Sequence, residues 1–298
     1  MTDAPSLPVA ARAAILAWFD AHGRRFAFRE SRDPYAILVA EAMAQQTQIG
    51  RAAERWLRFL ARFPTVRALA AASPADVLRE WRGLGYNRRA LNMWRAARVI
   101  VDEHGGQVPD DPTALERLPG IGPYTARAVA AIAFGRPVGA VDTNVRRVLG
   151  RAIAGRAVVP PRRLQALADD VVPSDRPAAW THALMDVGAT FCRPVQPRCG
   201  ACPVREWCAW AREPGGDEAV PARLPQRRPA AFPTTRRWLR GRLLDLLRDA
   251  DGDGWIAVPT RFGVHDAAAV EQALAGLAAD ALLERHGANR MRCRLPLA

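Results

Sequence analysis

Four cysteines lie close together in this 298-residue chain, with the spacing C-x6-C-x2-C-x5-C: Cys192, Cys199, Cys202 and Cys208. Four thiolates this close in sequence can all reach one metal centre. A structural zinc site usually has two C-x2-C pairs separated by a longer loop, and this cluster has only one such pair. The spacing therefore favours an iron–sulfur cluster with four cysteine ligands, and it leaves zinc and disulfide pairing as alternatives.

A lone carboxylate in an apolar segment is the second feature that could take part in a reaction. Glu41 interrupts the stretch from Tyr35 to Ala44, which is otherwise apolar. Burial raises the pKa of a carboxyl group, so Glu41 can hold a proton near neutral pH and act as a general acid. The alternative is a glutamate on a solvated helix face, but the positions three and four residues away carry no charge.

A Gly-x-Gly turn before an apolar segment suggests an anion site. Gly120 and Gly122 are expected to form a turn too tight for side chains, with Pro123 at the first helical position and a helix from Tyr124 to Phe134. Backbone N–H groups at such a helix start bind phosphate well. An ordinary helix–turn–helix joint would look the same, but Asp142, which follows a short apolar run, favours chemistry beside a nucleic-acid backbone.

Two further residues have side chains that suit contacts with bases. Gln46 lies in a run of amides that follows Glu41, and amide groups pair well with adenine, although a polar helix end is an equal alternative. Tyr86 follows a second Gly-x-Gly turn and precedes Arg88 and Arg89. A tyrosine among arginines can stack on bases, or it can simply fill a core.

The charge balance indicates a polyanionic partner. The formal net charge is +13, with 43 basic and 30 acidic residues, and the sequence contains no lysine. A biased genome would explain arginine in place of lysine, but not the surplus of positive charge. No apolar signal segment or membrane-length run occurs. We therefore expect a cytoplasmic, nucleoid-associated monomer without a membrane partner.

The coarse pattern predicts helices almost throughout to about residue 212. Residues 213–232 are rich in Pro, Gly and Arg and read as a linker. The remaining segment shows helical patterns near 234–249 and 267–284 and strand patterns near 255–258 and 291–295. This arrangement predicts a small winged-helix-like module.

Together these segments resemble the helix-hairpin-helix (HhH-GPD) base-excision glycosylases, and among them the MutY-type adenine DNA glycosylases. EAMAQQTQ resembles the helix with the catalytic glutamate, LPGIGPYTARAVAAIAFG the hairpin, and VDTNVRRVLGR the segment with the aspartate. Residues 63–86 are similar almost position by position, and the cysteine spacing is that of the family's [4Fe–4S] loop. The chain resembles a short form without the MutT-like C-terminal domain.

The resemblance implies a mainly α, two-lobed helix-hairpin-helix DNA glycosylase fold. Residues 1–29 and 145–212 would form the iron–sulfur cluster helical domain, and residues 30–144 a six-helix barrel with the hairpin. Residues 213–232 would be the linker, and residues 233–298 the winged-helix-like module.

The resemblance also implies catalytic roles. Glu41 would protonate a flipped adenine and assist water, and Asp142 would stabilise the oxocarbenium ion left on the sugar. Tyr124 and Asn144 would support the two carboxylates.

The remaining implied roles concern DNA and the cofactor. Gln46 and Tyr86 would insert into the DNA beside the purine that lies opposite the adenine. Gly120 and Gly122 would bind the DNA backbone. Arg193 and Arg198 would contact phosphates. A [4Fe–4S] cluster would be held by Cys192, Cys199, Cys202 and Cys208.

The implied reaction is removal of adenine mispaired with 8-oxoguanine or guanine in double-stranded DNA. The related endonuclease III enzymes cut the backbone with a lysine at the position of Tyr124, so a chain without lysine predicts hydrolysis alone. Asp142-Thr143-Asn144 replaces the family's Asp-Gly-Asn, and Tyr86-Asn87 replaces Tyr-Tyr. Glycosylases of the same fold for thymine, uracil or hypoxanthine, and a non-catalytic iron–sulfur DNA-binding protein, therefore remain alternatives.

Overall fold

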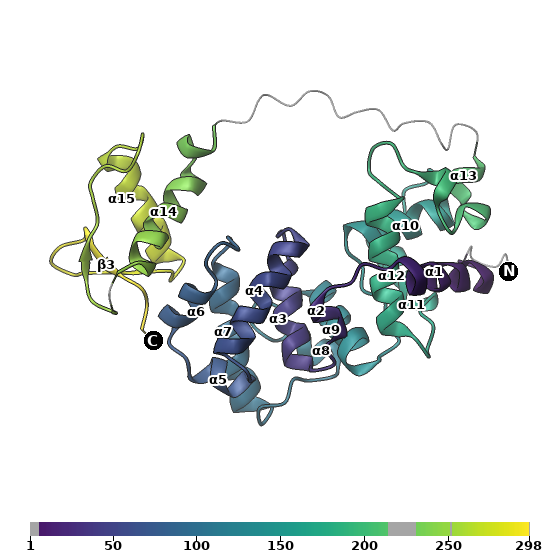
Figure 1. Cartoon of the computed structure of the whole chain (residues 1–298), viewed down its shortest axis with the longest axis horizontal. Coiled ribbons are helices and arrows are strands. Elements are labelled where there is room, and N and C mark those ends of the chain that lie inside the picture. Colours follow the sequence, from purple (N-terminus) through teal and green to yellow (C-terminus); the bar gives the residue numbers. More distant parts are fainter. Residues whose placement is uncertain (1–5, 214–230, 251, 298) are drawn as a thin grey trace. The chain divides into compact units, whose positions relative to one another are not determined.

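The protein is described by a computed structural model that covers residues 6–213, 231–250 and 252–297. Helices account for nearly all of its regular structure, and the strands lie in the C-terminal segment (Figure 1). The prediction of a mainly helical fold is therefore correct. Within the described ranges, no helix is long and apolar enough to cross a membrane.

The chain divides into two compact units. The first contains Met1–Glu41, Pro109–Arg117 and Ile121–Leu224, and the second contains Ala42–Val108, Leu118–Gly120 and Pro225–Ala298. This division differs from the predicted boundaries, because residues 30–144 fall partly in each unit. The difference arises because the helix after the glycine hairpin packs against the helix that precedes the cysteines, within the first unit.

The first unit is a layered set of helices around one core. Trp180, Leu149 and Ile15 are almost completely buried in that core, which draws on α1, α10, α11 and α12. Its elements are α1 (Val9–His22), α2 (Ala27–Glu30), α3 (Pro34–Ala44, whose last residues belong to the second unit), α8 (Pro112–Glu116), α9 (Pro123–Phe134), α10 (Thr143–Ala154), α11 (Pro161–Asp170), α12 (Pro177–Thr190), α13 (Ala209–Arg212) and the short turns η1 (Cys199–Ala201) and η2 (Arg205–Trp207).

The second unit begins with four helices around an aromatic core. Phe59 packs edge-on against both Phe63 and Trp81, and all three side chains are essentially inaccessible. The helices are α4 (Ile49–Arg62), α5 (Val66–Ala71), α6 (Pro74–Glu80) and α7 (Arg88–Glu103).

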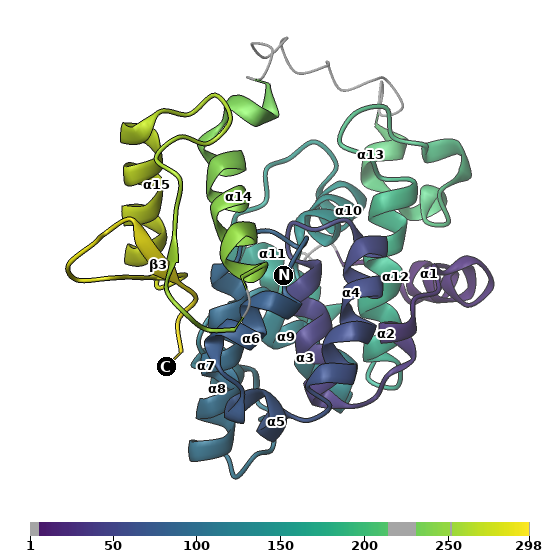
Figure 2. The same cartoon turned by 60° about the vertical axis from the view of Figure 1, so that its left-hand side comes forward.

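The C-terminal segment of the second unit forms a small module of two helices and a three-stranded sheet. Its helices α14 and α15 lie side by side, as Figure 2 shows. The strand order is β1-β3-β2, with both pairs antiparallel. The elements are η3 (Phe232–Thr234), α14 (Arg236–Arg248), β1 (Ile256–Ala257), α15 (Ala267–Ala279), β2 (Glu284–Arg285) and β3 (Arg292–Arg294).

The prediction for this module was right in outline and wrong in one element. The predicted strands near 255–258 and 291–295 pair as β1 and β3. The predicted second helix extends too far, because α15 ends at Ala279 and Glu284–Arg285 form strand β2 instead. Ala281 has a positive φ of 57°, which turns the chain out of the helix. The predicted linker lies almost entirely outside the described residues.

Candidate active site

Glu41 and Tyr124 meet within the first unit. Glu41 lies on the apolar helix α3, and Tyr124 is the second residue of α9, which begins at Pro123 as predicted. The Tyr124 hydroxyl donates a hydrogen bond of 3.0 Å to Glu41 Oε2 and also lies 3.8 Å from Met185 Sδ. A tyrosine hydroxyl can also accept a proton or a bond from a ligand, so this pair can orient a reacting group.

Burial makes Glu41 a weaker acid than an ordinary glutamate. Loss of solvation raises the pKa of its carboxyl group, the hydrogen bond from Tyr124 and the charge of Arg29 lower it, and the negative charge of Asp142 raises it; together they place the pKa at about 7. Burial also raises the pKa of Tyr124 well above its usual value, and the charges of Glu41 and Asp142 add to this effect. Glu41 can therefore carry a proton at neutral pH, and Asp142 lies close enough to both groups to affect them.

Asp142 is the N-cap of α10. Its Oδ1 accepts hydrogen bonds from the backbone N–H groups of Asn144 and Val145 at 2.8 and 2.7 Å, and its Oδ2 accepts one from Asn144 Nδ2 at 2.8 Å. A carboxylate at this position satisfies N–H groups that have no partner within the helix and interacts favourably with the helix dipole. Asn144 is fixed in turn by Arg147, which donates to its Oδ1 at 2.8 Å and to the Gly188 carbonyl at 2.8 Å.

A buried ion-pair cluster beside Glu41 was missed from the sequence. Asp186 is completely buried on α12, and Arg24 and Arg29 both donate to its carboxylate, at 2.5–2.9 Å. Burial alone would raise the pKa of Asp186, but these hydrogen bonds hold it at about 2. The missed signal is the one that identified Glu41, a single acid within an apolar helical segment.

The two hairpin glycines have different structural requirements. Gly120 has a φ of 78°, and a Cβ there would lie 2.6 Å from Asn92 Cβ, so only glycine fits. Gly122 has a φ of −94°, and a Cβ would meet no heavy atom within 4 Å. The expectation of a turn too tight for side chains is therefore right for Gly120 and wrong for Gly122, where the backbone is open to a ligand.

Gln46 and Tyr86 are exposed residues in an unusual backbone conformation. Their φ angles are 53° and 44°, values that residues other than glycine rarely adopt. Both lie in the second unit, and both follow a carbonyl that the Arg89 guanidinium binds. Arg89 Nη1 donates to the Gln45 carbonyl at 2.6 Å, and Nη2 donates to the Gly85 carbonyl at 3.3 Å. Its other acceptors lie on the same two segments: the carbonyls of Ala42, Met43 and Leu84, and Thr47 Oγ1.

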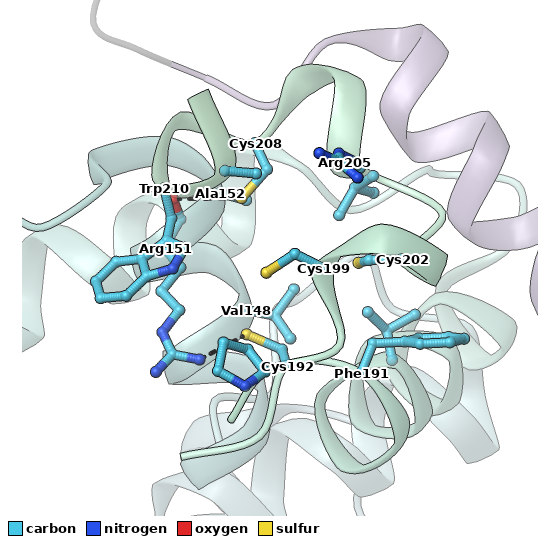
Figure 3. Close-up of a pocket in the computed structure, with 14 residues that line it drawn as sticks. Val148, Arg151, Ala152, Phe191, Cys192, Cys199, Cys202, Arg205, Cys208 and Trp210 are labelled. Carbon is cyan, nitrogen blue, oxygen red and sulfur yellow. Dashed lines mark hydrogen bonds between the residues drawn. The ribbon is translucent and has the colours of Figure 1, made fainter. Parts of the chain in front are cut away.

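The four clustered cysteines line one cavity in the first unit. Figure 3 shows Cys192, Cys199, Cys202 and Cys208 around this space, together with Arg151 and Trp210. The cavity holds about 390 Å³ of empty space, part of it open to solvent, and apolar side chains of α10 and α12 complete its wall. Arg151 donates to Cys192 Sγ at 3.5 Å and stacks on Trp210 at 4.7 Å.

The four cysteines supply the thiolate donors that an iron–sulfur cluster takes. In the described parts of the chain, no three Cys, His, Asp or Glu side chains come close enough to bind one metal ion. Four sulfur donors spread around a cavity are what a multi-iron cluster requires. Burial raises the pKa of the Cys202 thiol to about 11. Arg193 and Arg198, in the loop between the first two cysteines, are exposed as expected.

Comparisons with known proteins agree with this geometry. Residues 39–174 match the model of the HhH-GPD superfamily base excision DNA repair proteins. The chain is 44% identical over 278 residues to an adenine DNA glycosylase of Mycobacterium tuberculosis (strain CDC 1551 / Oshkosh), a match that covers 91% of this chain and 89% of the relative. The chain belongs to the adenine DNA glycosylase family. The resemblance inferred from the motifs is thereby confirmed.

Other members of this family and its superfamily extend the comparison. An adenine DNA glycosylase of Mycolicibacterium smegmatis is 41% identical over 280 residues, with 93% of each chain covered. Because such matches span more than nine tenths of the chain, they include much of the C-terminal module. The solved structure of a thermostable thymine-DNA glycosylase has 29% identity and a TM-score of 0.63, covering 67% of this chain and 94% of its own. The helix-hairpin-helix glycosylase fold predicted from the motifs is thus shown.

Proposed function

We propose that this protein removes adenine mispaired with 8-oxoguanine or guanine from double-stranded DNA, in base excision repair, by hydrolysis of the N-glycosidic bond. One arrangement carries the proposal: Tyr124 donates a hydrogen bond of 3.0 Å to Glu41 on an apolar helix, and the Asp142 carboxylate lies close enough to influence both groups. Such a pair supplies one group that holds a proton and one that holds a negative charge at the same pH.

The reaction follows from these two protonation states. Glu41 donates its proton to N7 of the extruded adenine, and the C1′–N9 bond breaks with its electron pair going to the base. Asp142 stabilises the oxocarbenium ion by its negative charge. Glu41, now ionised, accepts a proton from the water that adds to C1′. Tyr124 orients Glu41, and Asn144 orients Asp142, through the hydrogen bonds described above.

The reaction requires the base to leave the helical stack. Gln46 and Tyr86 are assigned to insertion into the duplex beside the purine opposite the adenine. Their exposure and left-handed backbone conformation support this role. The backbone at Gly120 and Gly122 and the exposed Arg193 and Arg198 are assigned to phosphates. The enzyme would act as a monomer on nucleoid DNA in the cytoplasm.

Cys192, Cys199, Cys202 and Cys208 are assigned to a [4Fe–4S] cluster. Such a cluster supplies a rigid cross-link between segments of the loop, since it joins four side chains at one point. The chain's own contribution is the cavity between α10 and the cysteine loop, and the loop that presents Arg193 and Arg198.

The enzyme would hydrolyse the glycosidic bond without cutting the backbone. A lysine Schiff base is needed for lysine-dependent strand cleavage, and the sequence has no lysine. Incubation with an adenine mispair should yield abasic sites that break only after alkali. A covalent complex trapped in quantity by borohydride would contradict this.

A thymine or uracil mismatch glycosylase is the second candidate. It is favoured by the thymine-DNA glycosylase structure with a TM-score of 0.63 and by Thr143 between Asp142 and Asn144. Excision from duplexes with A:8-oxoguanine, A:G, A:C and T:G separates the two candidates. Faster excision of adenine than of thymine supports the first, and the reverse order would overturn it. Glu41→Gln should lower the excision rate by about 10²–10⁴ but leave duplex binding intact, whereas a non-catalytic binder would have no excision activity to lose.

A further inference from the structure

The C-terminal module has a contact with the proposed strand-entering tyrosine. The Arg237 guanidinium, on the first turn of α14, lies 5.1 Å from the centroid of the Tyr86 ring. Its Nη2 would also lie 3.9 Å from a Cβ placed on Gly85. Arg237 and Tyr86 both belong to the second unit, and both are exposed, Tyr86 to 49%. Arg237 of the module therefore lies next to Tyr86, which is proposed to insert into DNA.

Two more arginines gather at the same loop. Arg55, on α4, would lie 3.4 Å from a Cβ on Gly83, and Arg88 begins α7 with a side chain that is 72% exposed. We call Tyr86 with Arg55, Arg88 and Arg237 the wedge patch. Its guanidinium groups come from three segments, so the fold brings positive charge to the turn 83–88 that carries the exposed Tyr86 ring.

The charges of the wedge patch are poorly compensated. Among the described residues, no carboxylate forms an ion pair with Arg55 or Arg237, and Arg88 has only Asp280, at 3.6 Å. Asp280 is shared with Arg240, which it binds at 2.5 Å. A surface with surplus positive charge beside an aromatic ring attracts a polyanion.

At the contact between the module and α6, in contrast, the arginine charges are paired with carboxylates. Arg79 pairs with Asp253 at 2.7 Å, and Arg82 pairs with Asp249. Arg248, which is 9% exposed, pairs with Asp245 at 3.2 Å. Where the module packs on α6, the arginines of both sides have acidic partners in the module. The arginines of the wedge patch therefore differ from those of the packing contact, because their charges are left largely without carboxylate partners among the described residues.

We propose that Arg237 is a DNA-contacting residue that binds a phosphate of the strand beside which Tyr86 inserts. The proposal deepens the proposed function, since it assigns the C-terminal module to that site. A guanidinium matches the geometry of a phosphate through two parallel N–H groups. The cation–π contact with Tyr86 holds the guanidinium close to the entry point and is weak enough to exchange for a phosphate.

The test is the salt dependence of duplex binding, measured by fluorescence anisotropy with a tetrahydrofuran abasic analogue opposite 8-oxoguanine. Arg237→Ala should weaken binding several-fold and reduce the slope of log K against log salt by about 1. Arg237→Lys should keep the slope, because an ammonium also releases a counterion. The loss should be equal on an undamaged duplex, since a phosphate carries no sequence information.

Arg242→Ala is the matched control, because Arg242 lies on the same helix, about 140° around its axis from Arg237. Its side chain is 52% exposed and pairs with Asp245. It should leave both affinity and slope unchanged. An unchanged slope for Arg237→Ala, an equal loss for Arg237→Lys, or a loss confined to one opposing base would each overturn the proposal.

Two further measurements separate the possible failures. Thermal unfolding should show that Arg237→Ala leaves the unfolding midpoint close to that of the wild type, as expected for an exposed cation–π pair. A clear drop in that midpoint, with an unchanged binding slope, would make Arg237 a packing residue. Adenine excision by the wild-type protein on the same duplexes tests the proposed function by itself. A wild type that excises no adenine would overturn that function, while the slope still decides whether Arg237 contacts DNA.

Discussion

Glu41 can act as an acid only while it holds its proton, and burial sets the pH at which it loses it. With a pKa of about 7, the protonated form declines as the pH rises through neutrality. The single-turnover excision rate should therefore fall at alkaline pH with a midpoint near 7. Glu41→Gln should lower the rate by about 10²–10⁴, the usual contribution of a general acid. A rate that rises through this range would contradict the assignment.

The same pKa shift affects folding stability. In the unfolded chain Glu41 ionises near its ordinary value of 4.5, but in the folded protein it keeps its proton to about 7. Its contribution to stability is therefore present below pH 4.5 and is lost as the pH rises towards 7. Glu41→Gln should be more stable than the wild type at pH 8, by about 1–3 kcal/mol.

Denaturant unfolding of the two proteins across pH measures this difference directly. The gain should shrink as the pH falls towards the ordinary pKa of glutamate. A Gln variant that is equally stable or less stable at alkaline pH would show that the folded protein does not penalise the ionised carboxylate.

The Tyr124 hydroxyl opposes the effect of burial on Glu41. It donates a hydrogen bond to the carboxylate at 3.0 Å and so lowers the pKa of Glu41. Tyr124→Phe should therefore raise that pKa and move the alkaline limb of the rate profile to higher pH. The same single-turnover series measures the shift. A limb that stays in place or moves to lower pH would mean that the hydrogen bond does not favour the ionised form.

At the scale of elements, Arg89 holds two loops in a conformation that they would not adopt alone. Its guanidinium binds carbonyls at the end of α3 and in the turn before α7, directly before Gln46 and Tyr86. Arg89→Ala should remove the charged donor from these carbonyls, although Gly85 and Gln45 also accept from Trp81 Nε1 and Thr47 Oγ1, and it should cost about 2–4 kcal/mol of unfolding free energy. Lysine has fewer donors and should recover only part of this loss.

Stability alone does not separate a structural role of Arg89 from a role in positioning the loops. We expect the abasic-analogue duplex to bind Arg89→Lys more weakly, at a temperature where that variant is fully folded. Equal binding by the folded variant and the wild type would show that Arg89 stabilises the protein without positioning Gln46 and Tyr86.

The sequence was sufficient for the elements whose signals are local. Pro123 starts α9 and Phe134 is its last residue, as the pattern predicted. It was also sufficient to find Glu41, whose apolar neighbours are contiguous in the chain. Asp186 has the same local signal, but its partners Arg24 and Arg29 are about 160 residues away. Such pairs are created by helix packing, which no local pattern encodes.

At the scale of the whole molecule, the C-terminal module is an integral part of the second unit. Arg248 donates to the Leu78 carbonyl and to Asn87 Oδ1, each at 2.8 Å, and so connects α14 to α6 and to the residue after Tyr86. Arg248→Leu should loosen the module, and thermal unfolding should then show an early transition separate from the main one. Arg242→Ala should keep the wild-type profile. One unchanged transition in Arg248→Leu would indicate that other contacts hold the module.

Asp142 is both the proposed stabiliser of the sugar cation and the N-cap of α10. These two roles determine which substitution gives an inactive variant that still folds and binds its substrate. Truncation to alanine would remove the reactive charge and also unravel the start of a helix, so that inactivity and misfolding could not be told apart. Asparagine at position 142 keeps an oxygen for the two backbone N–H groups. It is the substitution to choose for capturing an intact lesion complex.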